Sequence, residues 1–276
     1  MAPLHTVHLL PLLDEKLLAL LRSLHPEDWE RPTLAPGWRV RDVALHLLDG
    51  NLRTLSMLRD GYFGQAPASG SYADVVSFLN KLNADWVAAG QRLSPAVITW
   101  LLALSGPEYQ QYLASLDPEA PAVFSVAWAG EEQSANWFHI AREYTEKWHH
   151  QQQIRQAVGQ EAALFTAELY YPFLDTCLRA LPHQYRNTEA VAGTTLLISI
   201  TGEGGGHWLL RRLPAGWQLE APVTTQMPTT HITLAGAVAW RLFTKSLPRP
   251  QAEQHVHTSG EARLAEPLFS MLTVMA

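Results

Sequence analysis

The chain has 276 residues, of which 47% are hydrophobic and 17% are charged, and its formal net charge is −6. This length and composition are those of a globular protein with enough apolar material for two domains. The negative balance and the lack of a basic run argue against a nucleic-acid-binding surface, which requires clustered Lys and Arg.

The N-terminal stretch MAPLHTVHLLPLLDEKLLALL is apolar, but it does not have the pattern of a signal peptide. No basic region precedes it, and His, Asp and Glu interrupt it. No later stretch approaches the roughly 20 continuous apolar residues that span a bilayer. We therefore expect a cytoplasmic protein with no membrane partner. Cys177 is the only cysteine, which excludes an intramolecular disulfide, and its apolar surroundings predict a buried core residue.

The first 160 residues predict helices, because apolar residues recur with a period near 3.6. The expected helices cover residues 9–24, 40–61, 72–92, 95–116 and 134–158. Gly159 follows the last of them at a position typical of a helix C-cap. Several long helices in succession indicate a helical bundle.

The pattern changes after about residue 190, where β-rich runs alternate with turns and short helices. Expected strands lie at 194–200, 207–213, 216–221 and 230–234, and expected helices at 235–247 and 260–272. This mixture predicts a small α+β domain. A helix expected over 163–186 is compatible with either half. We divide the chain into domains at 1–160 and 161–276, with the boundary between 160 and 190.

The stretch EYTEKWHHQQQIRQ, residues 143–156, is the candidate functional segment. Glu146 and His150 are four residues apart on the expected helix, so their side chains can converge on one point. A carboxylate oxygen and an imidazole nitrogen suit zinc, nickel, iron or manganese. Two alternatives remain open at this point: His149 has an equally usable spacing from Glu146, and the whole polar face can simply be solvated.

His46 is the candidate third ligand. It interrupts the apolar run ALHLL at the edge of the buried stripe of the helix expected over 40–61. By itself, such a residue is more often a core histidine with satisfied hydrogen bonds. Together with Glu146 and His150 it makes a site of two histidines and one carboxylate, whose remaining positions hold water or substrate.

Two stretches resemble the DinB-like, mycothiol-dependent maleylpyruvate isomerase family. WERPTLAPGWRVRDVALHLLDG, from Trp29 to Gly50, is similar to its opening signature, with Asp42 four residues before His46-Leu47. REYTEKWHHQQQIR is similar to its later helix, in which an arginine-led segment carries Glu-x-x-x-His. The resemblance extends over roughly residues 8–160, and it selects Glu146 and His150 rather than His149.

The resemblance implies a four-helix bundle in which His46, Glu146 and His150 bind a divalent metal, with zinc expected first and nickel, iron or manganese as alternatives. It also implies that the metal activates a low-molecular-weight thiol, which opens an epoxide, displaces a leaving group or adds to a double bond and so permits isomerisation. We therefore expect a thiol S-transferase or isomerase whose partners are a small thiol and an electrophile. No protein nucleophile is required. We expect a monomer or a homodimer.

Two other functions remain as alternatives. The first is a metal- or ligand-binding protein without turnover. The second is a metal-dependent hydrolase, which requires a general base, and Glu143 is a candidate if its face of the helix is enclosed. The substrate also stays open, because Thr244-Lys245-Ser246 stands where the resemblance leads us to expect a Thr-Gly-Arg turn.

Two further motifs are interpreted as structural. The glycine-rich GEGGGH, Gly202–His207, separates two β-rich runs, so we expect a hairpin turn rather than a phosphate-binding loop. His255 and His257 can lie on one side of a strand, and no third ligand is near them in the sequence.

Overall fold

The computed structural model describes residues 2–221 and 227–274. The chain forms two compact units. The helical unit holds His5–Val123 and Glu146–Glu161, and the sheet unit holds Phe124–Thr145 and Ala162–Val274 together with the first residues up to Leu4. The helix α5 (Asn136–Ala157) therefore contributes its first part, through Thr145, to the sheet unit and the rest to the helical unit.

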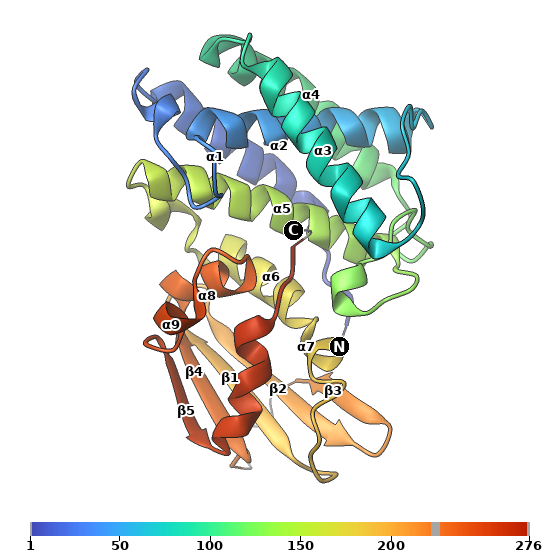
Figure 1. Cartoon of the computed structure of the whole chain (residues 1–276), viewed down its shortest axis with the longest axis vertical. Coiled ribbons are helices and arrows are strands. Elements are labelled where there is room, and N and C mark those ends of the chain that lie inside the picture. The colour runs from blue at the N-terminus through green and yellow to red at the C-terminus, as the bar shows by residue number, and fades with distance from the viewer. Residues whose placement is uncertain (1, 222–226, 275–276) are drawn as a thin grey trace. The chain divides into compact units, whose positions relative to one another are not determined.

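The helical unit contains the helices expected from the first half of the sequence (Figure 1). They are α1 (Leu10–Ser23), α2 (Val40–Thr54), α3 (Tyr72–Gly90), α4 (Pro95–Ser115) and the C-terminal part of α5. Ser71 and Ser94 cap α3 and α4, because each hydroxyl accepts a hydrogen bond from a backbone N–H in the first turn. Helix α2 continues into a short π-helical segment, Leu55–Arg59.

The apolar stripe of α2 lies in the core of the helical unit. Val40, Val43 and Ala44 are fully buried and Leu47 nearly so, as its 3.6-residue spacing predicts. They pack in one cluster with leucines of α1 and with Ile98 and Leu102 of α4. The stripe therefore fixes which face of α2 is turned inward.

Helix α5 ends as the sequence predicts. Gly159 has a φ of +72°, in the left-handed region that glycine enters without steric penalty. Its position allows the N–H of Gln160 to donate to the carbonyl of Arg155 at 2.8 Å, which closes a Schellman motif.

The sheet unit is built on a five-stranded sheet of order β3-β2-β1-β4-β5, drawn from yellow to red in Figure 1. The strands are β1 (Thr195–Thr201), β2 (Gly206–Leu213), β3 (Gly216–Glu220), β4 (Thr230–Ala235) and β5 (Val256–Gly260). β1 pairs with β4 in parallel, and the other neighbouring strands are antiparallel. Gly202–Gly205 forms the turn between β1 and β2, so the expected hairpin is confirmed.

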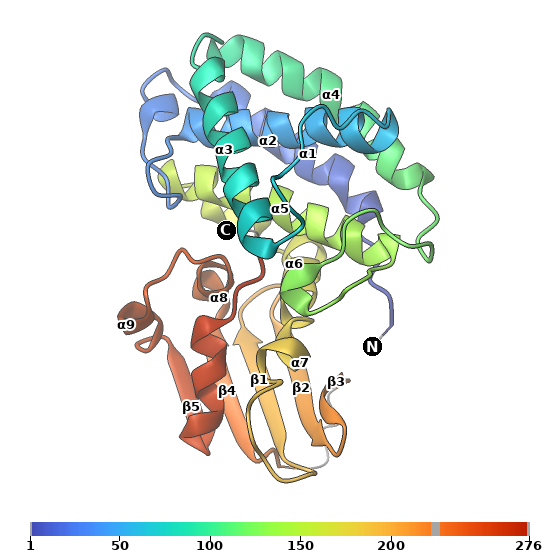
Figure 2. The same cartoon turned by 45° about the vertical axis from the view of Figure 1, so that its right-hand side comes forward.

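Helices cover one face of the sheet, and Figure 2 shows α7 (Leu181–Gln184) lying against it. Helix α8 (Gly236–Phe243) and the 3₁₀ helix Ala262–Ser270 also contact strands of this sheet. The short helix α9 (Arg249–Ala252) leads into β5. Cys177 on α6 (Ala167–Leu178) is fully buried, as its surroundings predict.

Two expectations need correction in detail. The helix expected over 163–186 is divided into a 3₁₀ turn at Glu161–Leu164, α6 and α7. The helix expected over 260–272 is a 3₁₀ helix that contains Pro267, which has no N–H to donate to a longer α-helical ladder.

The pair His255 and His257 flanks the start of β5, which pairs with β4 at the edge of the sheet. No helix among the described residues is long and apolar enough to cross a membrane.

Candidate metal centre

Helix α2 positions His46. The Asp42 carboxylate accepts a hydrogen bond of 2.9 Å from the backbone N–H of Arg39 and thereby caps the N-terminus of the helix. His46 lies beside the buried stripe of α2 and is itself half-buried. Because the stripe must face the core, the imidazole is held at the edge of the core and close to α5.

Helix α5 positions Glu146 and His150 on successive turns. His150 Nε2 lies 3.5 Å from Glu146 Oε2, as expected for an i,i+4 pair. The face of α5 that carries them is not a solvent-exposed helix face. His149, His150, Gln152 and Gln153 on this helix are all buried.

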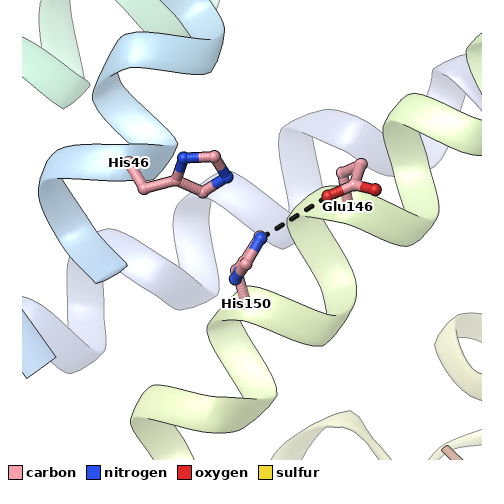
Figure 3. Close-up of side chains that lie close together, drawn as sticks. All are labelled: His46, Glu146 and His150. Carbon is pink, nitrogen blue, oxygen red and sulfur yellow. Dashed lines mark ion pairs between the residues drawn. The ribbon is translucent and has the colours of Figure 1, made fainter. Parts of the chain in front are cut away.

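The three candidate ligands converge. One possible ligand atom from each of His46, Glu146 and His150 lies within 4.8 Å of the other two. Figure 3 shows His46 reaching from α2 toward the two side chains of α5. The His46 and His150 ring centroids are 4.5 Å apart, and the rings meet edge to face at 71°.

The donor set fits a divalent transition metal. Within the part of the chain that the structure describes, Nδ1 of His46 is buried and has no hydrogen-bond partner, a condition that normally costs about 1–3 kcal/mol. His150 Nδ1 lies 2.9 Å from Gln153 Oε1, so an N–H on this nitrogen would leave the lone pair of Nε2, which lies 3.5 Å from Glu146 Oε2, for a metal ion. A ligand histidine commonly makes such a hydrogen bond with its second nitrogen. Two imidazoles and one carboxylate suit zinc and its neighbours.

His149 does not join the three-residue cluster. Its Nδ1 lies 4.0 Å from Glu146 Oε2, and its ring centroid lies 3.9 Å from that of His150. His149 is therefore a buried neighbour of both candidate ligands on α5.

The electrostatics of the site favour the metal-binding forms of His46 and Glu146 at neutral pH. Burial, followed by the charge of His150, lowers the pKa of His46 well below its ordinary value, against the opposing charge of Glu146. Burial alone raises the pKa of Glu146, but the hydrogen bond to His150 and the charges of His149, His150 and His46 outweigh it and bring that pKa to about 2. His46 is thus neutral and Glu146 ionised near pH 7, which are the forms that bind metal.

Trp38 packs against the two histidines. Its ring centroid lies 5.1 Å from that of His46 and 6.4 Å from that of His150, and it is stacked on His150 at 29°. This apolar surface restricts how the two imidazoles can rotate. It also gives a bound ligand a flat aromatic surface beside the centre.

A buried polar network, which the sequence reasoning missed, connects the helices that carry the ligands. Lys147 Nζ donates to Asp14 Oδ1 at 3.0 Å and to Asn51 Oδ1 at 2.8 Å, and it lies 4.6 Å from the centroid of the Tyr109 ring. Gln110 Nε2 donates to the other oxygen of Asp14 at 2.6 Å. No local signal in the sequence reveals it, because Lys147 stands in the polar stretch TEKWHHQQQ and its partners Asp14 and Asn51 come from distant segments.

The model of the mycothiol maleylpyruvate isomerase N-terminal domain matches residues 10–155, more than half of the chain. The chain belongs to this family. The matched span contains all three candidate ligands and confirms the resemblance seen in the sequence.

Two solved structures share the fold of this family member. One is a mycothiol-dependent maleylpyruvate isomerase, with 12% sequence identity, and the other is a histidine-to-alanine mutant of the mycothiol-dependent maleylpyruvate isomerase, with 14%. In each case the TM-score is 0.50, and the match covers 93% of this chain and 92% of the other. No curated protein matches the sequence. These comparisons confirm a helix-rich N-terminal part followed by a part built on a sheet.

The segment Thr244-Lys245-Ser246 follows α8 directly. Lys245 has a φ of +59°, a left-handed conformation that is uncommon for a residue other than glycine. Thr244 Oγ1 donates to the carbonyl of Trp240 at 2.9 Å. The segment thus ends the helix, and its lysine occupies the position where the sequence comparison led us to expect the glycine of a Thr-Gly-Arg turn.

Proposed function

We propose that this chain is a divalent-metal-dependent thiol S-transferase or isomerase, which acts on a small electrophile with a low-molecular-weight thiol. The observation that carries the proposal is the convergence of His46, Glu146 and His150 in a member of the mycothiol maleylpyruvate isomerase family. The two similar structures bear the name of a mycothiol-dependent enzyme, so a thiol of that kind is the first cosubstrate to test.

His46 and His150 would hold the metal through nitrogen and Glu146 through oxygen, with zinc as the first candidate and nickel, iron and manganese after it. A divalent cation bound there lowers the pKa of a coordinated thiol and so supplies a thiolate near neutral pH. The side chain of Glu146 keeps 28% of its surface exposed, which leaves the centre accessible to small molecules.

The chain's own residues have defined tasks in this proposal. Gln153 orients His150 through its 2.9 Å hydrogen bond, and Trp38 confines both imidazoles with its ring. A cysteine nucleophile is not needed, and the sole cysteine of the sequence, Cys177, is fully buried. Glu143, the base considered for hydrolysis, lies 3.3 Å from Arg142 in an ion pair, so we favour thiol chemistry over hydrolysis.

The metal is tested by elemental analysis of the purified, untagged protein. His46→Ala, Glu146→Ala and His150→Ala should each lose most of the bound divalent metal. His149→Ala is the matched control, because it removes a buried neighbouring imidazole that is outside the cluster. Equal loading of all four variants, or no metal after reconstitution with zinc, would overturn the metal site.

Catalysis is tested separately on the metal-loaded protein. We expect conjugation or isomerisation of small electrophiles with mycothiol or another small thiol, and loss of that activity in the three ligand variants. A protein that binds metal normally but is inert with every thiol would support the alternative of a metal- or ligand-binding protein without turnover.

A further inference from the structure

Strand β5 forms one edge of the sheet and is open to solvent. It pairs with β4 on one side only, and Figure 1 and Figure 2 both show it as the outermost strand. Four of its five residues are exposed. By contrast, β3, at the other edge, has Trp217 and Leu219 buried and one exposed residue. The β5 edge is therefore the more accessible of the two for the addition of another strand.

The backbone of β5 has unused hydrogen-bonding groups. In an antiparallel pair, the N–H and C=O groups of alternate residues point away from the neighbouring strand. Among the residues that the structure describes, these outward groups of β5 make no hydrogen bond. A row of unpaired donors and acceptors on an edge strand is a template for pairing with another chain.

The features that commonly protect edge strands are missing from β5. Lysines, prolines and bulges hinder the pairing of one edge with another. The sequence of β5, VHTSG, has no Lys and no Pro. Its register with β4 runs without a bulge from Val256 to Gly260. The edge is therefore short but regular, and it can pair over its whole length.

We propose that β5 pairs with β5 of a second copy of this chain, antiparallel and about a two-fold axis beside Thr258, so that one sheet continues through both copies. Such an axis presents the same edge from both sides and closes the assembly as a dimer. Only an axis at this position pairs all five residues, with Val256 opposite Gly260 and His257 opposite Ser259. The inference does not depend on the candidate metal centre.

The charges that flank β5 favour a second copy in this register. Glu253 precedes the strand by three residues and Arg263 follows it by three, and their side chains are 50% and 59% exposed. The proposed axis therefore sets Glu253 of each copy opposite Arg263 of the other. An axis one residue earlier would set Glu253 opposite Glu261, where two carboxylates repel. The present ion pairs of Glu253 and Arg263 lie on the surface and hold these charges only weakly.

The dimer should be weak and should dissociate on dilution. A five-residue edge buries less than the roughly 1,200 Å² at which stable interfaces begin. We expect a dissociation constant on the order of 10 μM. Sedimentation velocity of the untagged full chain, from about 1 to 300 μM, should then show a change from monomer to dimer.

Cysteine cross-linking tests the register. Directly opposite residues of antiparallel strands have Cα atoms about 4.5–5.5 Å apart, within the range of a disulfide. Thr258→Cys should therefore form a covalent dimer under mild oxidation with diamide. Ser259→Cys is the matched control, because its exposed residue lies on the same strand but about 7–8 Å from its own copy across the axis. The native Cys177 is fully buried and should not contribute.

A lysine at the axis tests the interface in the opposite direction. Thr258→Lys places two like charges directly opposite each other and should raise the dissociation constant about 5-fold or more. Ser259→Lys adds the same charge opposite His257 and should weaken the dimer less. Circular dichroism checks that both variants fold, and the two cysteine variants decide the question if Thr258→Lys does not. A chain that stays monomeric up to about 300 μM, equal cross-linking of the two cysteine variants, or equal effects of the two lysines would each overturn the proposal.

Discussion

Lys147 Nζ lies 2.8 Å from Asn51 Oδ1 and so connects α5 to α2 beside the candidate metal centre. Lys147 follows Glu146 directly on α5, and Asn51 lies five residues after His46 on α2. Because the same ammonium also pairs with Asp14 of α1 at 3.0 Å, three helices share one buried charge. This network sets the position of α5 along α2, and with it the distance between the ligands.

Lys147→Met should destabilise the protein by about 3 kcal/mol or more, because it leaves the Asp14 carboxylate buried without its cation. The free energy of unfolding in urea, measured on metal-free protein, checks this. Lys81→Met is the matched control: Lys81 forms an exposed i,i+4 pair with Asp85, and its loss should change stability by less than about 0.5 kcal/mol. Equal small effects of both substitutions would contradict a structural role for the network.

Gln153→Met should lower the affinity for zinc about 10- to 100-fold without abolishing binding, because it removes the group that orients His150. Competition with a chromophoric chelator measures the affinity directly. Gln156→Met, one turn further along α5 and only half-buried, controls for the loss of an amide from this helix. The prediction fails if Gln153→Met binds zinc as tightly as Gln156→Met.

His139 should make the protein less stable in acid. Burial, aided by the charge of Arg142 and opposed by that of Glu143, lowers its pKa from 6.5 to about 4. This folded-state pKa lies below the unfolded one. As the pH falls from 6.5 to 4, the unfolded chain therefore binds a proton at His139 that the folded chain does not bind. The contribution of His139 to the free energy of unfolding is thus fully present above pH 6.5, and up to about 3 kcal/mol of it is lost as the pH falls to 4.

The His139 prediction is checked by measuring the free energy of unfolding of wild type and His139→Gln across that window. The variant should show a flatter dependence on pH, because glutamine does not titrate. His255→Gln, which changes an exposed histidine, should keep the wild-type slope. A variant as acid-sensitive as wild type would contradict the assignment.

Trp38 should report metal binding by fluorescence. Its ring lies 5.1 Å from His46 and 6.4 Å from His150 between centroids, so a quenching ion such as nickel or copper at the centre would be close to it. Nickel should reduce tryptophan emission of the wild type, and Trp38→Phe should remove most of that reduction. Trp100→Phe, which changes a tryptophan that is 58% exposed on α4, should leave it intact. Identical quenching in both variants would argue against a metal beside Trp38.

Local patterns in the sequence predict much of this protein. The 3.6-residue apolar spacing predicts α1 to α5, and the alternation of β-rich runs with GEGGG predicts the β1–β2 hairpin, because both depend on neighbours in the chain. The i,i+4 convergence of Glu146 and His150 is likewise a property of one helix. His46, the third candidate, is indicated in the sequence only by its place beside an apolar stripe and by family resemblance.

The tertiary structure decided what depends on packing between distant segments. The meeting of His46 with His150, 104 residues later, requires α2 and α5 to pack in one register, and the burial of the polar residues on α5 follows from their neighbours rather than from their own sequence. The pairing of Lys147 with Asp14 and Asn51 is equally invisible in any local pattern. Side chains of one helix turn are brought together by backbone geometry, whereas those of different helices meet only because burial of apolar surface selects one packing of the whole core.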